Sequence, residues 1–140
     1  MRTDEMNEEM RLEAIRWQER RLAALYGQNV KLPEDAFPKT GMVAIADDGR
    51  RIAAGMLYLE ASVPVAVCGF LFANPDAGMR EKRDAIRLVL SVLPVYARKL
   101  GAKYVLSVFG RRSVNRMLDR MGGETVESSE TKILWMPKEV

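Results

Sequence analysis

The feature that most constrains the fold of this sequence is a strand–helix–strand unit in its middle. The apolar run VAVCGFLF (Val65–Phe72) stops at Asn74-Pro75, and apolar residues then recur at helical spacing from Glu81 to Leu100. A second apolar run, Lys103 to Phe109, follows directly. Because one helix connects the two strands, they must lie parallel with a right-handed crossover. Ligands tend to bind where the carboxyl ends of such strands open a crevice, so the sequence predicts a binding site near residues 74–83.

The flanking patterns predict antiparallel strands and two further helices around this unit. Asp48-Gly49 suits a hairpin turn, and Pro94 should kink or divide the long helix. The other expected elements are a helix at Asn7–Tyr26, a loop at 28–40, strands at Gly41–Ala46 and Arg51–Glu60, a helix at Arg112–Met121, and a strand pair at Glu124–Val126 and Thr131–Met136. We therefore expect a single α/β (α+β) domain over residues 1–140, with a mixed, mostly antiparallel sheet, one central parallel strand pair and flanking helices.

The absence of histidine narrows the chemistry open to this chain. None of the 140 residues is histidine, which excludes Ser-His-Asp triads, Cys-His dyads and histidine metal sites. No Walker loop or CxxC pair is present either, so we expect no metal site. The single cysteine, Cys68, lies in an apolar run and is expected to be a small buried residue in a reducing compartment. The polar, acidic start MRTDEMNEEM is unlike a signal peptide, and no stretch is long enough to span a bilayer, so we expect a soluble, cytoplasmic protein without a membrane partner.

Basic residues gather at the start of the long helix. Arg80, Lys82, Arg83 and Arg87 surround a helix N-terminus, whose free N–H groups and positive dipole attract anions. Positive side chains oppose that dipole, so their clustering favours an anion-binding role over a stabilising one. Two acidic neighbours in the same turn weaken this argument. An exposed, charged first turn of a helix therefore stays open as the alternative.

From Gly41 to Pro137 the order of elements resembles the GNAT superfamily of acyl-coenzyme-A-dependent N-acetyltransferases. GMVAIADDGRRIAAGMLYLE is similar to the second and third strands of that superfamily, and VAVCGFLFANP to its fourth strand and the start of its pyrophosphate loop. AIRLVLSVLPVYARKLGAKYVLSVF resembles its long helix and the strand that follows, and SVNRMLDRMGG its late helix. The similarity is greatest to the short GNAT-like proteins of phages and bacteria. Whether the first helix replaces the usual first strand stays open.

The resemblance implies an acetyl-CoA site, although several motif positions differ. Phosphate loops of the superfamily read Q/R-x-x-G-x-G/A, and the matching hexad is Arg80–Ala85, with Arg83 in place of the middle glycine. Glycine permits close backbone approach, so Arg83 could replace it in charge only if its side chain swings clear. The tyrosine that serves many members as general acid corresponds to Leu118, and the final aromatic residue corresponds to Gly123. The residues that the resemblance assigns to the cofactor are Phe72, Ala73, Asn74, Arg80, Lys82, Arg83, Asp84, Ala85, Arg111 and Arg112; for the last two, a solvated loop is an equal alternative.

Two side chains at the end of the 51–60 strand are candidates for acid–base chemistry. Glu60 could accept a proton from an ammonium substrate if it were partly desolvated, and Tyr58 lies two residues earlier on the same face. A surface carboxylate at a strand end is the alternative for Glu60. Backbone N–H groups of residues 70–73 could polarise a thioester carbonyl if the strand bulges there, and Gly69 permits such irregular backbone.

These patterns support two functions and argue against a third. The first is an N-acetyltransferase, in which an amine on a small molecule or a peptide attacks acetyl-CoA directly. Without the tyrosine, water would protonate the leaving thiolate, or the thiolate would stay ionised. The second is a catalytically inactive GNAT-fold binding or regulatory protein. Nucleic-acid binding is disfavoured because no aromatic stacking pattern accompanies the basic residues, and the resemblance also allows a homodimer.

Overall fold

The computed structural model describes residues 1–60, 62–109, 112–128 and 133–137. Within these ranges the chain forms β-strands and α-helices, and a short 3₁₀ helix, η1, follows the first helix. No described helix is long and apolar enough to cross a bilayer. In chain order the elements are β1 (Arg2–Glu5), α1 (Glu8–Tyr26), η1 (Glu34–Ala36), β2 (Thr40–Ile45), β3 (Arg51–Leu59), β4 (Val65–Ala73), α2 (Met79–Lys99), β5 (Tyr104–Phe109), α3 (Arg112–Arg120), β6 (Gly123–Ser128) and β7 (Ile133–Pro137).

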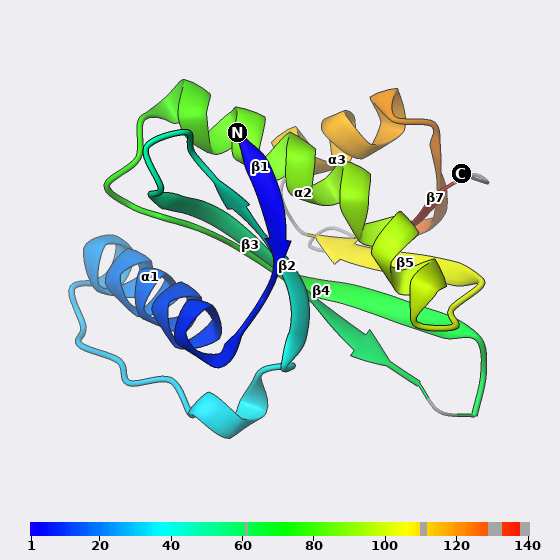
Figure 1. Cartoon of the computed structure of the whole chain (residues 1–140). Coiled ribbons are helices and arrows are strands. Elements are labelled where there is room, and N and C mark those ends of the chain that lie inside the picture. The colour runs from blue at the N-terminus through cyan, green and yellow to red at the C-terminus, as the bar shows by residue number, and fades with distance from the viewer. Residues whose placement is uncertain (61, 110–111, 129–132, 138–140) are drawn as a thin grey trace.

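The described strands form one mixed sheet of seven strands in the order β1-β2-β3-β4-β5-β7-β6. Neighbouring strands are antiparallel except β4 and β5, which are parallel and are connected by α2. Figure 1 shows α1 on one side of this sheet and α2 with α3 on the other. The predicted fold class is therefore confirmed: a mostly antiparallel sheet with one central parallel pair, flanked by helices.

Residues 2–5 form a strand that the sequence does not predict. The segment RTDE is polar, and the strand lies at the edge of the sheet, so it carries no apolar alternation. Backbone pairing with β2, from Arg2–Ile45 to Glu5–Met42, holds it in place. The N-terminal ammonium lies 2.6 Å from Asp47 Oδ1, at the end of β2. The first helix thus follows a first strand and does not replace it.

Capping residues define both ends of α1, and α2 differs in its bounds from the predicted helix. The side chain of Asn7 accepts a hydrogen bond from the Met10 N–H at 2.8 Å, and Gly27 closes α1 in the left-handed conformation, with φ at 65°. α2 begins at Met79, two residues before the predicted start, and passes through Pro94 as one helix. Of the two alternatives expected at Pro94, a kink or a division of the helix, the division is therefore excluded. Of the expected final strands, β6 is longer than predicted, and the start of the other at 131–132 lies outside the described residues.

Two apolar cores form on the two sides of the sheet. On one side α1 buries Ala14, Ile15 and Trp17 against the sheet. On the other side α2 buries Val89 and Leu93, and this core extends to α3. β3 and α2 are tightly packed at Gly55, where an added Cβ would lie 2.7 Å from Leu93 Cδ1 and from Val89 Cγ1. The absence of a side chain at residue 55 lets the long helix lie close over the centre of the sheet.

We predict that Gly55→Ala lowers the free energy of unfolding by about 1–3 kcal/mol, because the new methyl group overpacks the contact between β3 and α2. Urea denaturation followed by circular dichroism measures the change. Gly69→Ala on the neighbouring strand is the matched control, since its Cβ would meet one atom at an ordinary 3.8 Å, Tyr58 Cε2. Equal effects of the two substitutions would contradict this close packing.

Candidate functional site

The parallel strands β4 and β5 separate before either of them ends. Their pairing runs from Val65–Tyr104 to Cys68–Ser107, which is four residue pairs. β4 then continues to Ala73, whereas the rest of β5 pairs with β7 on its other side. In the described ranges no strand pairs with the β5-facing edge of β4 beyond Cys68. Backbone donors and acceptors on this edge can therefore bind a ligand.

A β-bulge at Gly69 lies where the strands separate. Phe70 pairs with Met56 and Cys68 pairs with Leu57 on β3, so Gly69 is the extra residue. One extra residue reverses the alternation of side chains along a strand. Cys68 accordingly lies in the core beside α2, whereas Phe70 packs on the α1 side of the sheet. The irregular backbone thus lies directly before residues 70–73, next to the predicted oxyanion donors.

A cavity of about 950 Å³ lies over the open half of β4. α1, the start of α2, and α3 surround it, and Leu71 and Ala73 of β4 contribute to its lining. Much of the remaining lining is aliphatic, including Leu25, Ile86 and Met117. None of the lining residues is acidic and eight are basic: Arg20, Arg21, Arg80, Lys82, Arg83, Arg87, Arg116 and Arg120. Such a cavity suits an elongated ligand that has both anionic groups and an apolar part.

The loop between β4 and α2 is shaped by Asn74 and Asp76. The Asn74 side chain donates to the Arg51 carbonyl oxygen at 3.0 Å and accepts from the Asp76 N–H at 2.9 Å. Arg20 of α1 donates two hydrogen bonds, at 2.7 and 3.1 Å, to the Asp76 carboxylate. This guanidinium also holds the pKa of Asp76 below its usual range. The loop therefore has a defined shape, and α1 is tied to it.

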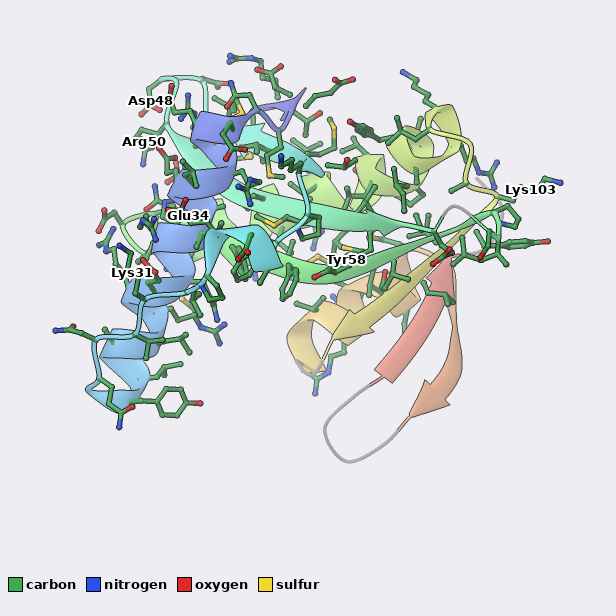
Figure 2. The ribbon with its side chains drawn as sticks, turned by 90° about the horizontal axis from the view of Figure 1, so that it is seen from below. Lys31, Glu34, Asp48, Arg50, Tyr58 and Lys103 are labelled. Atoms are coloured by element: carbon green, nitrogen blue, oxygen red, sulfur yellow. The ribbon has the colours of Figure 1, made fainter. Side chains whose placement is uncertain are left out.

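The first turn of α2 is free to bind an anion. Gly78 is its N-cap, and no side chain caps the helix there. The amides of residues 79–81 have no acceptor within the described part of the chain. Glu81, the acidic residue of this turn, accepts hydrogen bonds from Arg50 at 2.7 and 3.0 Å, and Arg50 also binds Asp48 in the β2–β3 hairpin (Figure 2). Arg50 thus offsets the one negative charge that would repel an anion from this turn.

The residues that the sequence assigns to the cofactor do not all lie together. Phe72 and Ala85 are buried in the two cores, and Asn74 is used in the loop. Asp84 is exposed and does not line the cavity. Arg111 and the side chain of Arg112 lie outside the described part of the structure. The residues that do line the cavity are Ala73, Arg80, Lys82 and Arg83.

The two predicted acid–base residues lie at different places. Tyr58 is half-exposed on the α1 side of the sheet (Figure 2), where its ring lies 5.7 Å from that of Phe70, beside the bulge. Glu60 lies in the β3–β4 turn, where its carboxylate accepts hydrogen bonds from the N–H and hydroxyl groups of Ser62. The backbone of Glu60 pairs with Val65, three residues before Cys68, so it is about 10 Å from the opening of the strands. Tyr58 therefore lies closer than Glu60 to the point where β4 and β5 separate, and it is the better placed of the two for acid–base chemistry.

A buried arginine fixes the segment opposite the bulge. Arg11 of α1 is nearly inaccessible to solvent and donates to the carbonyl oxygens of Glu34 and Phe37 at 2.6 and 3.2 Å. Its guanidinium also forms a two-bond ion pair with Glu8, and this contact is the largest cause of the raised pKa of Arg11. Phe37 is thereby held with its ring 4.9 Å from that of Phe70. Arg11 thus fixes the position of Phe37, which packs against Phe70 beside the bulge.

Sequence reasoning missed four arginines of the cavity: Arg20, Arg21, Arg116 and Arg120. Arg116 and Arg120 are one helical turn apart, a spacing that could have indicated a shared face. No local signal relates Arg20 and Arg21 to the start of α2, because packing of the buried face of α1 on the sheet places them there.

Several solved acetyltransferase structures have the same fold as this chain. An aminoglycoside 6'-acetyltransferase type Ii superposes with a TM-score of 0.72 at 11% identity, covering 97% of this chain and 95% of that one. A GCN5-related N-acetyltransferase from Kribbella flavida gives 0.69 at 11% identity, over 96% and 95% of the two chains. The chain has the GNAT fold. The PaiA N-acetyltransferase from Thermoplasma acidophilum, solved in complex with coenzyme A, matches 71% of this chain and 60% of its own, with a TM-score of 0.56 at 15% identity.

No family model matches this sequence, and no curated protein is significantly similar to it. This sequence therefore adopts the GNAT fold although it shares few identical residues with the acetyltransferases of the same fold. This agrees with the departures at Arg83 and Leu118, because both stand where the motifs of the superfamily have other residues.

We predict that Cys68 is inert in the native GNAT fold. It is 1% exposed, and burial raises the pKa of its thiol to about 12. A disulfide reagent such as Ellman's reagent should label it roughly 100-fold or more slowly in the native protein than in urea, since the thiolate is the reactive form. Rapid native labelling would show that β4 and β5 separate before Cys68, and would contradict the pairing described above.

Proposed function

We propose that this protein is an acetyl-CoA-dependent N-acetyltransferase that acts on a small-molecule or peptide amine. The observation that carries the proposal is the cationic cavity over the open half of β4, directly after the bulge. The GNAT fold and the acetyltransferases that share it support the same reaction class.

The cavity fits the chemical groups of coenzyme A. Uncapped amides in the first turn of α2, together with Arg80 and Lys82, suit its diphosphate, and one anion at a helix N-terminus gains about 0.3–1 kcal/mol from the dipole. Arg83 is exposed and lines the cavity, so its guanidinium can meet a phosphate from the side. The open edge of β4 suits the amide-bearing arm of the cofactor, because that arm can pair with the backbone as a further strand would.

The chain would promote acetyl transfer by positioning and by backbone donors. Acetyl-CoA would supply an acetyl group activated as a thioester: the amine nitrogen would bond to the acetyl carbon, the carbon–sulfur bond would break, and the thiolate would leave. N–H groups of β4 next to Gly69 would stabilise negative charge on the acetyl oxygen. The amine would enter from the aromatic side of the bulge, where Tyr58, Phe37 and Phe70 form the wall.

Proton transfer would rely on water. Leu118, at the position where many superfamily members have a tyrosine, is fully buried and belongs to the core on the α2 side. A thiolate with an ordinary pKa near 8.5 leaves readily without a protein acid. Tyr58 is the side chain best placed to assist, although its hydroxyl donates a long hydrogen bond of 3.4 Å to the Ala36 carbonyl oxygen.

Calorimetric titration with acetyl-CoA tests this proposal. We expect binding, and we expect Arg80→Ala to weaken it about 10- to 100-fold, because a charge-assisted hydrogen bond to phosphate contributes roughly 1.5–3 kcal/mol. Lys99→Ala, an exposed cation at the other end of the same helix, is the matched control and should change affinity less than 2-fold. No heat at millimolar acetyl-CoA would refute the proposal.

The second candidate is a GNAT-fold binding or regulatory protein without catalysis. The burial of Leu118 favours it, because that helix offers no acid at the position expected for one. A panel of polyamines, aminoglycosides and peptides, followed by release of free thiol, separates the two candidates. Thiol release that Arg80→Ala abolishes would support the enzyme, and binding of acetyl-CoA without release by any amine would support the second candidate.

A further inference from the structure

The mouth of the cavity carries more positive charge than coenzyme A can neutralise. Coenzyme A has about four negative charges near neutral pH, on its diphosphate and its 3'-phosphate. Six of the lining arginines have no ion pair or hydrogen bond with any other described side chain: Arg21, Arg80, Arg83, Arg87, Arg116 and Arg120. Lys82 also lines the cavity, and no salt bridge joins it to a described carboxylate.

Five of these six arginines form two rows that line the same cavity. Arg80, Arg83 and Arg87 lie at i, i+3 and i+7 along α2, and Arg116 and Arg120 lie at i and i+4 along α3. Like charges at these spacings destabilise a helix by a few tenths of a kcal/mol per pair. Other arginines of this protein, such as Arg20 and Arg50, have carboxylate partners. The unpaired rows therefore mark a surface that meets anionic groups outside the chain.

Exposed apolar side chains border the same mouth. Met79 at the start of α2 is 85% exposed and Leu25 near the end of α1 is 59% exposed, and both line the cavity. Tyr26, next to Leu25, is 70% exposed. Methionine, tyrosine and arginine are enriched in protein–protein interfaces. Aliphatic side chains offer little stacking surface for bases, so this composition favours a protein partner over a nucleic acid.

We propose that, besides acetyl-CoA, the same site accepts and prefers an acyl group presented on the phosphopantetheine arm of an acidic carrier protein, which docks on the two arginine rows. The inference rests on the proposed function, because it concerns the donor of the same reaction. The arm of a carrier protein has the chemistry of the corresponding part of coenzyme A, so both fit along the open edge of β4. The two donors differ in what lies at the mouth: an adenosine phosphate in one case and an acidic protein surface in the other. The surplus positive charge and the exposed side chains of Met79 and Leu25 match an acidic protein surface better than an adenosine phosphate.

Affinity measurements with the full chain test the proposal. The probes are a purified bacterial acyl carrier protein in acetylated and apo forms, acetyl-CoA, and a single-stranded RNA, each at physiological salt. We expect the acetylated carrier to bind at least 10-fold more tightly than acetyl-CoA, and the apo form to bind more weakly than the acetylated form. The affinity for the carrier should fall as salt rises, because surface charges are screened.

Charge reversal locates the docking surface. Arg116→Glu with Arg120→Glu should weaken carrier binding at least 10-fold more than it weakens acetyl-CoA binding. Lys31→Glu with Lys103→Glu makes the same change in net charge at exposed positions outside the cavity lining (Figure 2), and it should leave carrier affinity within 2-fold. Circular dichroism and urea midpoints confirm that both variants are folded.

Three results would count against the carrier-protein proposal. Binding of acetyl-CoA without binding of the carrier would overturn this inference and leave the acetyltransferase proposal standing. Tighter binding of RNA than of the carrier, lost on the same charge reversal, would assign the arginine rows to nucleic acid. Binding of neither acetyl-CoA nor the acetylated carrier would overturn the inference together with the proposed function.

Discussion

The early end of hydrogen bonding between β4 and β5 is the constraint on which the rest of this site depends. Four residue pairs join the two strands. After Cys68, β4 continues without a partner on this edge in the described residues, and β5 pairs with β7. A parallel pair inside a sheet is normally buried from end to end. Here the bulge at Gly69 and the turn of β5 toward β7 leave one backbone edge unpaired in the middle of the sheet. A ligand that pairs with this edge would take the place of the missing strand and satisfy its backbone donors and acceptors.

The electrostatics of the molecule follow from the same opening. α2 must begin close to the end of β4, so its uncapped first turn lies at the mouth of the cavity. Two nearby acidic residues form ion pairs with arginines: Asp76 of the β4–α2 loop with Arg20, and Glu81 of the first turn of α2 with Arg50. These pairs also connect α1 and the β2–β3 hairpin to the ends of the β4–α2 loop. Six arginines without an ion pair to any described side chain line the cavity, where they would attract an anionic donor.

Sequence patterns predict the centre of this protein better than its edges. The Val65–Phe109 unit specifies a parallel pair because its apolar runs and its helix have unmistakable periods, and Gly69 indicates where backbone can be irregular. The strand at 2–5 is polar and depends on pairing with β2, so no local pattern predicts it. Arg20 and Arg21 reach the cavity because α1 packs across the sheet, and no local sequence pattern indicates such tertiary packing. Glu60 looks catalytic as a strand-end carboxylate, yet the structure has it bonded to Ser62 in a turn.

The most direct test of the central claim is a titration of the uniformly ¹⁵N-labelled protein with coenzyme A, followed by amide chemical shifts. If the unpaired edge of β4 and the first turn of α2 hold the cofactor, the largest changes should fall on residues 69–73 and 79–82, with small changes in β1 and β2. Shifts that avoid both segments, or that appear only on exposed arginine side chains, would contradict this account of the site.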